Sequence, residues 1–172
     1  VLIDYSGGTG ILLDRLKLRV FDRRFGVVIV DSSPKFLRVA LGKFHDDDRV
    51  AFRSLRWLKE DKRLQRLEEV LGPELLSRGV DAIASTNAIH LYLDLPGTLV
   101  SWAHVLRPGG RLILIQVRDR STRRELERPE YAPISSALPL LYSTAAEVTP
   151  LVTATGLTEL VVEPLTDEVL WG

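Results

Sequence analysis

The segment from Asp4 to Gly10 has the residue types of a binding site for a nucleotide-like ligand. Apolar residues lead into Asp4, the small residues Ser-Gly-Gly-Thr-Gly follow, and the apolar spacing from Ile11 onward is that of a starting helix. Glycines allow a backbone to approach a ligand closely, and the free N–H groups of a helix N-terminus point toward such a ligand. The segment therefore predicts a ligand site at a strand-to-helix turn, a feature that many Rossmann-like proteins share.

Two further groups of polar residues follow expected strands. Asp31 ends the apolar run Val27–Val30, and Asn87–His90 comes directly after the strand expected over Val80–Ser85. The carboxyl ends of parallel strands meet at one edge of a sheet, where α/β proteins bind their ligands. We therefore expect these residues to lie with Asp4 on one rim.

Hydrophobic periodicity predicts alternating strands and helices along the chain. Strands are expected over Val1–Tyr5, Val27–Val30, Val50–Phe52, Val80–Ser85, Arg111–Val117, Leu157–Glu163 and Val169–Trp171. Helices are expected over Ile11–Phe21, Pro34–Phe44, Lys59–Leu71, Pro96–Leu106 and Thr144–Gly156, with a polar loop over 118–131. The last two strands are too close for a helical crossover, so they should form an antiparallel hairpin.

This order predicts one α/β domain over residues 1–172. Its fold class is a Rossmann-like three-layer αβα sandwich, with a seven-stranded, mostly parallel sheet that ends in a C-terminal antiparallel hairpin. Because Val1 already lies within a strand pattern, we expect an N-terminal part of the full chain to precede it.

The composition narrows the function classes. The 172 residues include 23 Lys and Arg against 23 Asp and Glu, a balance that gives no basic footprint for nucleic acid. No apolar run is long enough to span a bilayer, so a cytoplasmic protein without membrane contact is expected. The absence of cysteine excludes disulfides and thiolate metal sites, and no metal site is predicted. There is also no methionine, and nothing in the composition indicates the oligomeric state.

Several motifs together resemble those of class I S-adenosylmethionine-dependent methyltransferases. The glycine-rich segment Asp4–Gly10 is similar to the first motif of that family, and Asp31 stands where the family places an acidic residue. The segment Val80–His90 is similar to the fourth-strand motif, and Val105–Leu114, with its Arg-Pro-Gly-Gly turn, closely resembles the entry into the fifth strand. The resemblance implies S-adenosylmethionine as the cofactor.

The resemblance also implies a role for each motif residue. Asp31 would accept hydrogen bonds from the ribose hydroxyls, and Asp4 would lie near the cationic amino group of the cofactor. The backbone at Gly8 would lie against the cofactor, and Asn87 and Ala88 would line the methyl-transfer channel. The cofactor-binding residues implied in this way are Asp4, Ser6, Gly7, Gly8, Gly10, Asp31, Ser32, Ser54, Leu55, Asn87 and Ala88.

Two positions depart from the family pattern. Ser6 stands where members usually have glycine. The segment Arg53–Trp57 has no carboxylate, whereas many members bind the adenine amino group there with an acidic residue. Ser54 or a backbone group is the expected substitute, with Leu55 or Trp57 packing on the ring.

The predicted reaction is methyl transfer to a small-molecule acceptor, with His90 and Tyr92 as candidate catalytic residues or, alternatively, structural ones. Two other functions remain open. One is a non-catalytic binding or assembly module with this fold, since the adenine carboxylate and an unambiguous base are missing. The other is a nicotinamide-dependent oxidoreductase, although the turn lacks the third glycine of the dinucleotide fingerprint.

Overall fold

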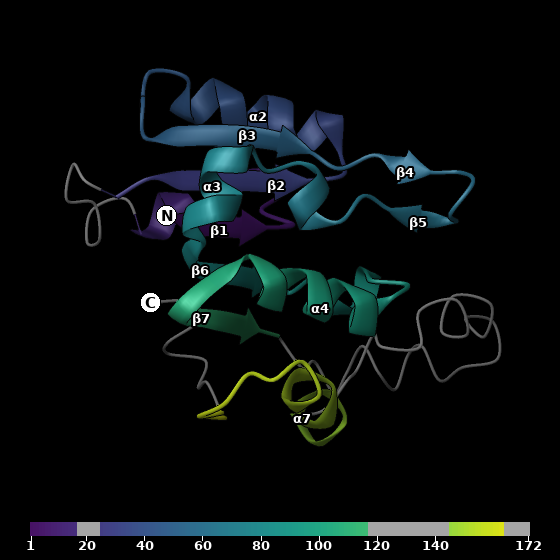
Figure 1. Cartoon of the computed structure of the whole chain (residues 1–172). Coiled ribbons are helices and arrows are strands. Elements are labelled where there is room, and N and C mark those ends of the chain that lie inside the picture. Colours follow the sequence, from purple (N-terminus) through teal and green to yellow (C-terminus); the bar gives the residue numbers. More distant parts are fainter. Residues whose placement is uncertain (17–24, 117–144, 164–172) are drawn as a thin grey trace, which may run out of the picture.

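The computed structural model describes residues 1–16, 25–116 and 145–163 of the chain (Figure 1). Its main sheet has five parallel strands in the order β3-β2-β1-β6-β7. These strands are β1 (Leu2–Tyr5), β2 (Val27–Asp31), β3 (Val50–Ser54), β6 (Val80–Thr86) and β7 (Leu106–Ile115). The order reverses between β1 and β6, and this switch point is where such sheets bind ligands.

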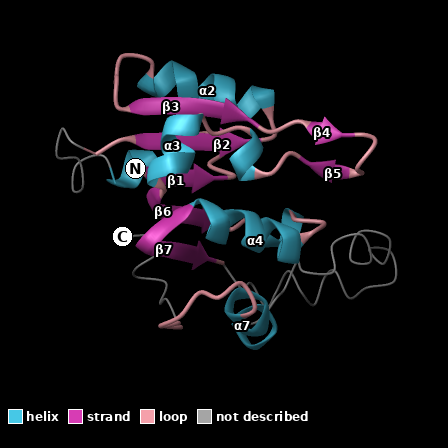
Figure 2. Cartoon of the chain, viewed as in Figure 1, coloured by secondary structure: helices cyan, strands magenta, loops and turns pink. Residues whose placement is uncertain are grey.

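Helices cover both faces of the sheet, as the colouring in Figure 2 shows. They are α1 (Ile11–Leu16), α2 (Pro34–Phe44), α3 (Pro73–Arg78), α4 (Leu95–Val105) and α7 (Ala145–Thr153), with short 3-10 turns η1 (Leu67–Glu69) and η2 (Ile89–Leu91). Side chains of α1 and α2 pack with Val27 and Ile29, whereas those of α4 and α7 belong to the cluster that holds Val28 and Val30. This alternation of strand side chains gives the three layers expected from the sequence.

Local signals explain where α2 and α4 begin. Ser33 caps α2 by accepting a hydrogen bond from the Phe36 N–H at 3.4 Å, with proline at the first helical position as predicted. Asp94 caps α4 by accepting from the Gly97 N–H at 2.9 Å. The helix predicted over Pro96–Leu106 is therefore confirmed with a shift of one residue.

The helix predicted over Lys59–Leu71 is wrong. The segment instead contains the antiparallel hairpin of β4 (Trp57–Leu58) and β5 (Arg63–Leu64), followed by η1. Lys62 has a φ of 51° in the turn, a conformation that no α-helix contains. Two of the leucines whose spacing indicated a helix, Leu67 and Leu71, are buried in the core. Leu67 begins the 3-10 turn η1, and Leu71 follows it. The hairpin projects past the carboxyl ends of the main strands (Figure 1).

The prediction of seven strands is also wrong for the described residues, whose main sheet has five. Residues 157–163 form no strand; Leu157 packs against the core, but Leu160, Val161 and Val162 are exposed. The strand predicted over Val169–Trp171 lies outside the described residues, as do the loop over 118–131 and the end of the helix expected over Ile11–Phe21. Four of the other predicted strands are found within two residues of the expected bounds, whereas β7 begins at Leu106, five residues before the start expected for the strand over Arg111–Val117.

None of the helices in the described parts of the chain has the length and apolar character that crossing a membrane requires.

Gly10 in the loop after β1 should respond to substitution differently from an exposed glycine. A Cβ at Gly10, whose φ is +79°, would lie 2.6 Å from Cε2 of Phe44, whereas a Cβ at Gly42 in α2 would meet nothing within 4 Å. Gly10→Ala should lower the free energy of unfolding by roughly 1–3 kcal/mol through backbone strain and overpacking. Gly42→Ala should raise it by about 0.5–1 kcal/mol. Urea denaturation of both variants tests this, and a Gly10→Ala chain as stable as the parent would contradict the loop geometry.

Candidate functional site

The loop between β1 and α1 bends sharply at the switch point of the sheet. Ser6, Gly8 and Gly10 all have positive φ values, of 57°, 56° and 79°. A Cβ at Gly7 would lie 2.7 Å from Cγ and Oδ2 of Asp4, so only glycine fits against this carboxylate. The glycine pair predicted to make the turn therefore has two functions, because Gly7 gives room to Asp4 and Gly8 supplies a left-handed backbone.

Asp31 connects this loop to the start of α2. Its Oδ2 accepts a hydrogen bond from the Gly8 N–H at 2.9 Å, and its Oδ1 accepts from the Ser33 N–H at 2.7 Å. Only 7% of Asp31 is exposed. Each carboxylate oxygen can accept more than one hydrogen bond, so Asp31 retains acceptor capacity for a ligand while it positions the loop.

Asp4 is the most unusual side chain of the site. It is 1% exposed, and neither of its carboxylate oxygens has a hydrogen-bond partner among the described residues. Burial, with a smaller contribution from the charge of Asp31, raises the pKa of Asp4 to about 7. A buried carboxyl group without a partner costs free energy, so a cation or a donor placed here would be bound favourably.

The edge continues along β2 and β3. Ser32 and Ser54 are exposed, and Ser54 pairs directly with Asp31 across the two strands. Leu55 is 3% exposed within the core, and its N–H donates to the Asp31 carbonyl at 3.0 Å. The structure therefore leaves the Ser54 hydroxyl at this edge, whereas the side chain and the N–H of Leu55 are already used inside the protein.

The segment after β6 brings another left-handed residue, Asn87, to the same edge. Asn87 has a φ of 51°, and its side-chain oxygen accepts from Gln116 at 3.1 Å. Ala88 is buried, and His90 lies with Nδ1 3.3 Å from the Gln116 amide nitrogen. Burial lowers the pKa of His90, and the contact with Gln116 opposes that shift. The imidazole is therefore largely neutral at pH 7.

Tyr92 connects this segment to the glycine-rich loop. Its hydroxyl donates to Ser6 Oγ at 2.9 Å and lies 2.8 Å from Ser85 Oγ. Its ring packs edge-on against Tyr5 and Trp102, and burial is the main cause that raises the pKa of Tyr92 to about 12. Tyr92 therefore keeps its proton and acts as a donor to Ser6.

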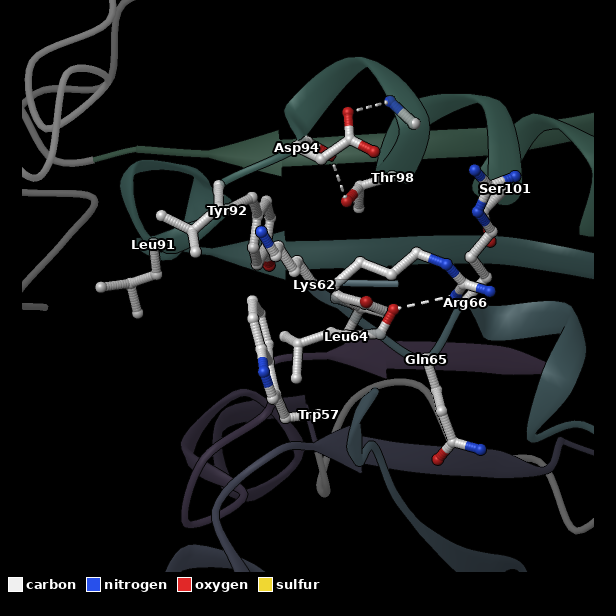
Figure 3. Close-up of a pocket in the computed structure, with 14 residues that line it drawn as sticks. Trp57, Lys62, Leu64, Gln65, Arg66, Leu91, Tyr92, Asp94, Thr98 and Ser101 are labelled. Atoms are coloured by element: carbon white, nitrogen blue, oxygen red, sulfur yellow. Dashed lines mark hydrogen bonds between the residues drawn. The ribbon is translucent and has the colours of Figure 1, made fainter. Parts of the chain in front are cut away.

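A hollow of about 250 Å³ opens beside these residues, between the β4–β5 hairpin and the start of α4. Figure 3 shows Trp57 and Leu64 of the hairpin on one side and Leu91 and Tyr92 on the other. We call this cavity the hairpin hollow. Sequence reasoning missed most of its lining, because it assigned the segment to a helix. The available signal was the polar run Lys59–Arg63, which separates the apolar pair Trp57-Leu58 from Leu64.

Asp4 should make the stability of the ligand-free chain depend on pH. Its pKa rises from 3.8 to about 7 on folding, so its stabilising contribution is full below pH 4 and is lost as the pH rises through 7. The Asp4→Asn variant does not have this pH-dependent loss. Its free energy of unfolding minus that of the parent should therefore increase by roughly 2–3 kcal/mol from pH 5 to pH 8. Chemical denaturation at both pH values measures the difference, with the exposed Asp48→Asn as the control that changes little. An equal difference at the two pH values would contradict the buried, unpartnered carboxyl.

Comparisons with known proteins agree with this geometry. A family model described as "Methyltransferase domain" matches residues 3–112. The hybrid PKS-NRPS synthetase apdA of Emericella nidulans is 26% identical over 117 residues, which cover 67% of this chain and 3% of that protein.

Solved structures share the fold at low sequence identity. Phosphoethanolamine N-methyltransferase 2 of Haemonchus contortus, solved with S-adenosyl-L-methionine, superposes with a TM-score of 0.67 at 17% identity, covering 97% of this chain and 35% of that chain. The trans-methyltransferase CalH, solved with SAH, gives a TM-score of 0.65 at 18% identity and covers 90% and 44% of the two chains. The chain thus spans less than half the length of each of these relatives.

The family match covers well over half of the residues and includes the glycine-rich loop, Asp31, the whole of β2, β3 and β6 and most of β1 and β7. The chain therefore belongs to the family of Rossmann-like, S-adenosylmethionine-dependent methyltransferase domains.

Proposed function

We propose that this chain transfers the methyl group of S-adenosylmethionine to a small-molecule acceptor. The observation that carries the proposal is the buried carboxyl of Asp4, which has no partner among the described residues and lies at the switch point beside the glycine-rich loop. A site that leaves such a group unpaired suits a ligand with a cationic group. The amino group of S-adenosylmethionine is one.

The remaining groups of the loop fit the other parts of the cofactor. Asp31 has free acceptor capacity for two ribose hydroxyls, and a carboxylate binds such donors more strongly than an amide does. The space beside Gly8 is open, since a Cβ there would meet nothing within 4 Å. In this proposal the backbone from Ser6 to Gly10 lies against the amino-acid tail and the ribose.

The adenine contact is assigned to the exposed side of β3. Ser54 presents a hydroxyl one strand away from Ser32, and both flank Asp31. The Leu55 side chain is 3% exposed and its N–H already donates to Asp31, so we assign the polar contact with adenine to the Ser54 hydroxyl. This hydroxyl takes the place of the acidic residue that many family members have at the position, and Trp57 is left to the hairpin hollow, which it lines.

The cofactor supplies an activated methyl group on a sulfonium centre, and the protein contributes position and exclusion of water. Asn87 and Ala88 are assigned to the wall of the transfer channel at the end of β6. Tyr92 retains its proton and cannot serve as the base at neutral pH. His90, which is largely neutral at pH 7, is the residue placed to accept a proton from the acceptor where the reaction requires it.

The proposal of a small-molecule acceptor rests on the hairpin hollow. A cavity of about 250 Å³ has room for a compact organic molecule. It adjoins the loop directly, because Tyr92 both lines the hollow and donates to Ser6. The equal numbers of acidic and basic residues give no support for a nucleic-acid acceptor.

Calorimetric titration of the chain with S-adenosylmethionine and S-adenosylhomocysteine tests the cofactor assignment. We expect micromolar binding of both, and Asp31→Ala should weaken binding by roughly 1.5–3 kcal/mol, the scale of hydrogen bonds to a charged group. His90→Ala should leave both affinities nearly unchanged, because we place His90 on the acceptor side. A folded parent chain that binds neither compound would favour a non-catalytic module, and an unchanged affinity of Asp31→Ala would contradict the role of Asp31.

The Tyr92–Ser6 contact yields a double-mutant prediction for the same assay. Ser6 holds a φ of 57°, which is unfavourable for a residue with a Cβ, and the Tyr92 hydroxyl fixes its side chain. Tyr92→Phe should weaken binding of S-adenosylhomocysteine about tenfold, within the range for a buried hydrogen bond. In a Ser6→Gly background the same change should have little effect, because glycine adopts this φ without support. Equal losses in both backgrounds would mean that Tyr92 acts on the pocket by another route.

A further inference from the structure

We propose that the hairpin hollow selects acceptors that carry a negatively charged group on an apolar body, with Lys62 and Arg66 as the residues that bind the charge. This inference rests on the proposed function, because it assigns a substrate class to the acceptor side of the same site. It depends on three observations. Apolar side chains at the hollow are exposed, two of its cationic side chains form no ion pair among the described residues, and the acidic residue in its lining already caps a helix.

Apolar side chains around the hollow are unusually exposed. Trp57 is 47% exposed, Leu91 is 54% exposed and Leu93 is 75% exposed, and all three line the cavity. Large apolar side chains that gather at one cavity indicate a surface that a ligand covers. They come from the hairpin and from the segment before α4, so an apolar body seated between them would contact both sides.

The cations of the hollow differ in their pairing. Arg63 forms two hydrogen bonds with the Glu69 carboxylate, at 2.9 and 2.8 Å, so its charge is compensated. Lys62 and Arg66 form no ion pair among the described residues, although both line the cavity. Lys62 also occupies the hairpin turn with a φ of 51° and lines the hollow from there.

Asp94 is the acidic residue in the lining, and the fold already uses it. Its Oδ1 accepts from the Gly97 N–H at 2.9 Å, and its backbone carbonyl accepts from Thr98 at 2.7 Å. Asp94 therefore serves as the N-cap of α4, and its single charge does not balance Lys62 and Arg66 together. An anionic ligand would find both an apolar surface and two positive charges that form no ion pair among the described residues, although the Glu69 carboxylate also attracts Arg66. A cationic ligand would meet net repulsion.

The test compares three probes with the same two-ring body and different charge. We would titrate 2-naphthoate, 2-naphthamide and 2-naphthylmethylammonium into the full chain saturated with S-adenosylhomocysteine, and measure each Kd by ligand-observed NMR. The account predicts that naphthoate binds about fivefold to tenfold more tightly than naphthamide, and that the ammonium compound binds most weakly. Lys62→Gln/Arg66→Gln should remove the preference for naphthoate and leave the Kd of naphthamide unchanged.

The matched control is Lys35→Gln/Arg38→Gln on α2, which removes the same two charge types from an exposed helix face away from the hollow. This variant should retain the preference for naphthoate. Equal affinity of the parent for naphthoate and naphthamide, or an equal loss in the control variant, would overturn the proposal. Binding of S-adenosylhomocysteine, measured in the same samples, separates this result from the proposed function: its absence would contradict the function, whereas its presence with no charge preference would contradict only the acceptor class.

Discussion

Two buried carboxyl groups at the carboxyl edge of one sheet are the constraint on which the rest of the site depends. Asp4 ends β1 and Asp31 ends β2, and the parallel pairing of these strands places them on the same rim. Burial, and to a smaller extent the charge of Asp31, makes a negative charge on Asp4 costly. The fold compensates Asp31 with two backbone N–H groups but gives Asp4 no partner among the described residues, so a bound cation or donor would supply stabilisation that these residues do not.

The backbone of the glycine-rich loop accommodates both carboxyl groups. Gly7 allows the chain to pass close to Asp4, and the Gly8 N–H binds Asp31. Ser6 needs support in its left-handed conformation, and Tyr92 supplies that support from beyond β6. The glycine-rich loop and the hairpin hollow are thus joined by one hydrogen bond, since Tyr92 also lines the hollow.

The sequence predicts the ligand-binding edge well, because its signals are local. Short apolar runs that end in Asp4 and Asp31, and a proline after the Ser33 cap, each specify their element within a few residues. The hairpin hollow was not predictable in the same way. The spacing of Leu64, Leu67 and Leu71 fits a helix, and only tertiary contacts turn this segment into a hairpin and a 3-10 turn. One such contact is the Arg63–Glu69 pair, and another is the bond from the Leu67 N–H to Ser101.

The difference between local signals and contacts of distant segments also explains why the atoms that each site residue uses could not be predicted. A motif can indicate that Leu55 and Tyr92 lie near the cofactor, but not which of their atoms the protein already uses. The structure shows that the Leu55 N–H is bonded to the Asp31 carbonyl and that the Tyr92 hydroxyl is bonded to Ser6. Such assignments depend on distances between strands that are far apart in the sequence, and no spacing rule gives them.

The central claim is that Asp4 is kept unpaired for the cationic group of the cofactor, and its pKa is the quantity that reports on this most directly. Carboxyl-carbon NMR of the chain labelled at aspartate, assigned with Asp4→Asn, would follow its titration with and without S-adenosylhomocysteine. The account predicts a pKa near 7 in the free chain and a fall of more than two units when the ligand binds, because a nearby cation favours the carboxylate. A pKa that stays the same in the saturated complex would contradict the account.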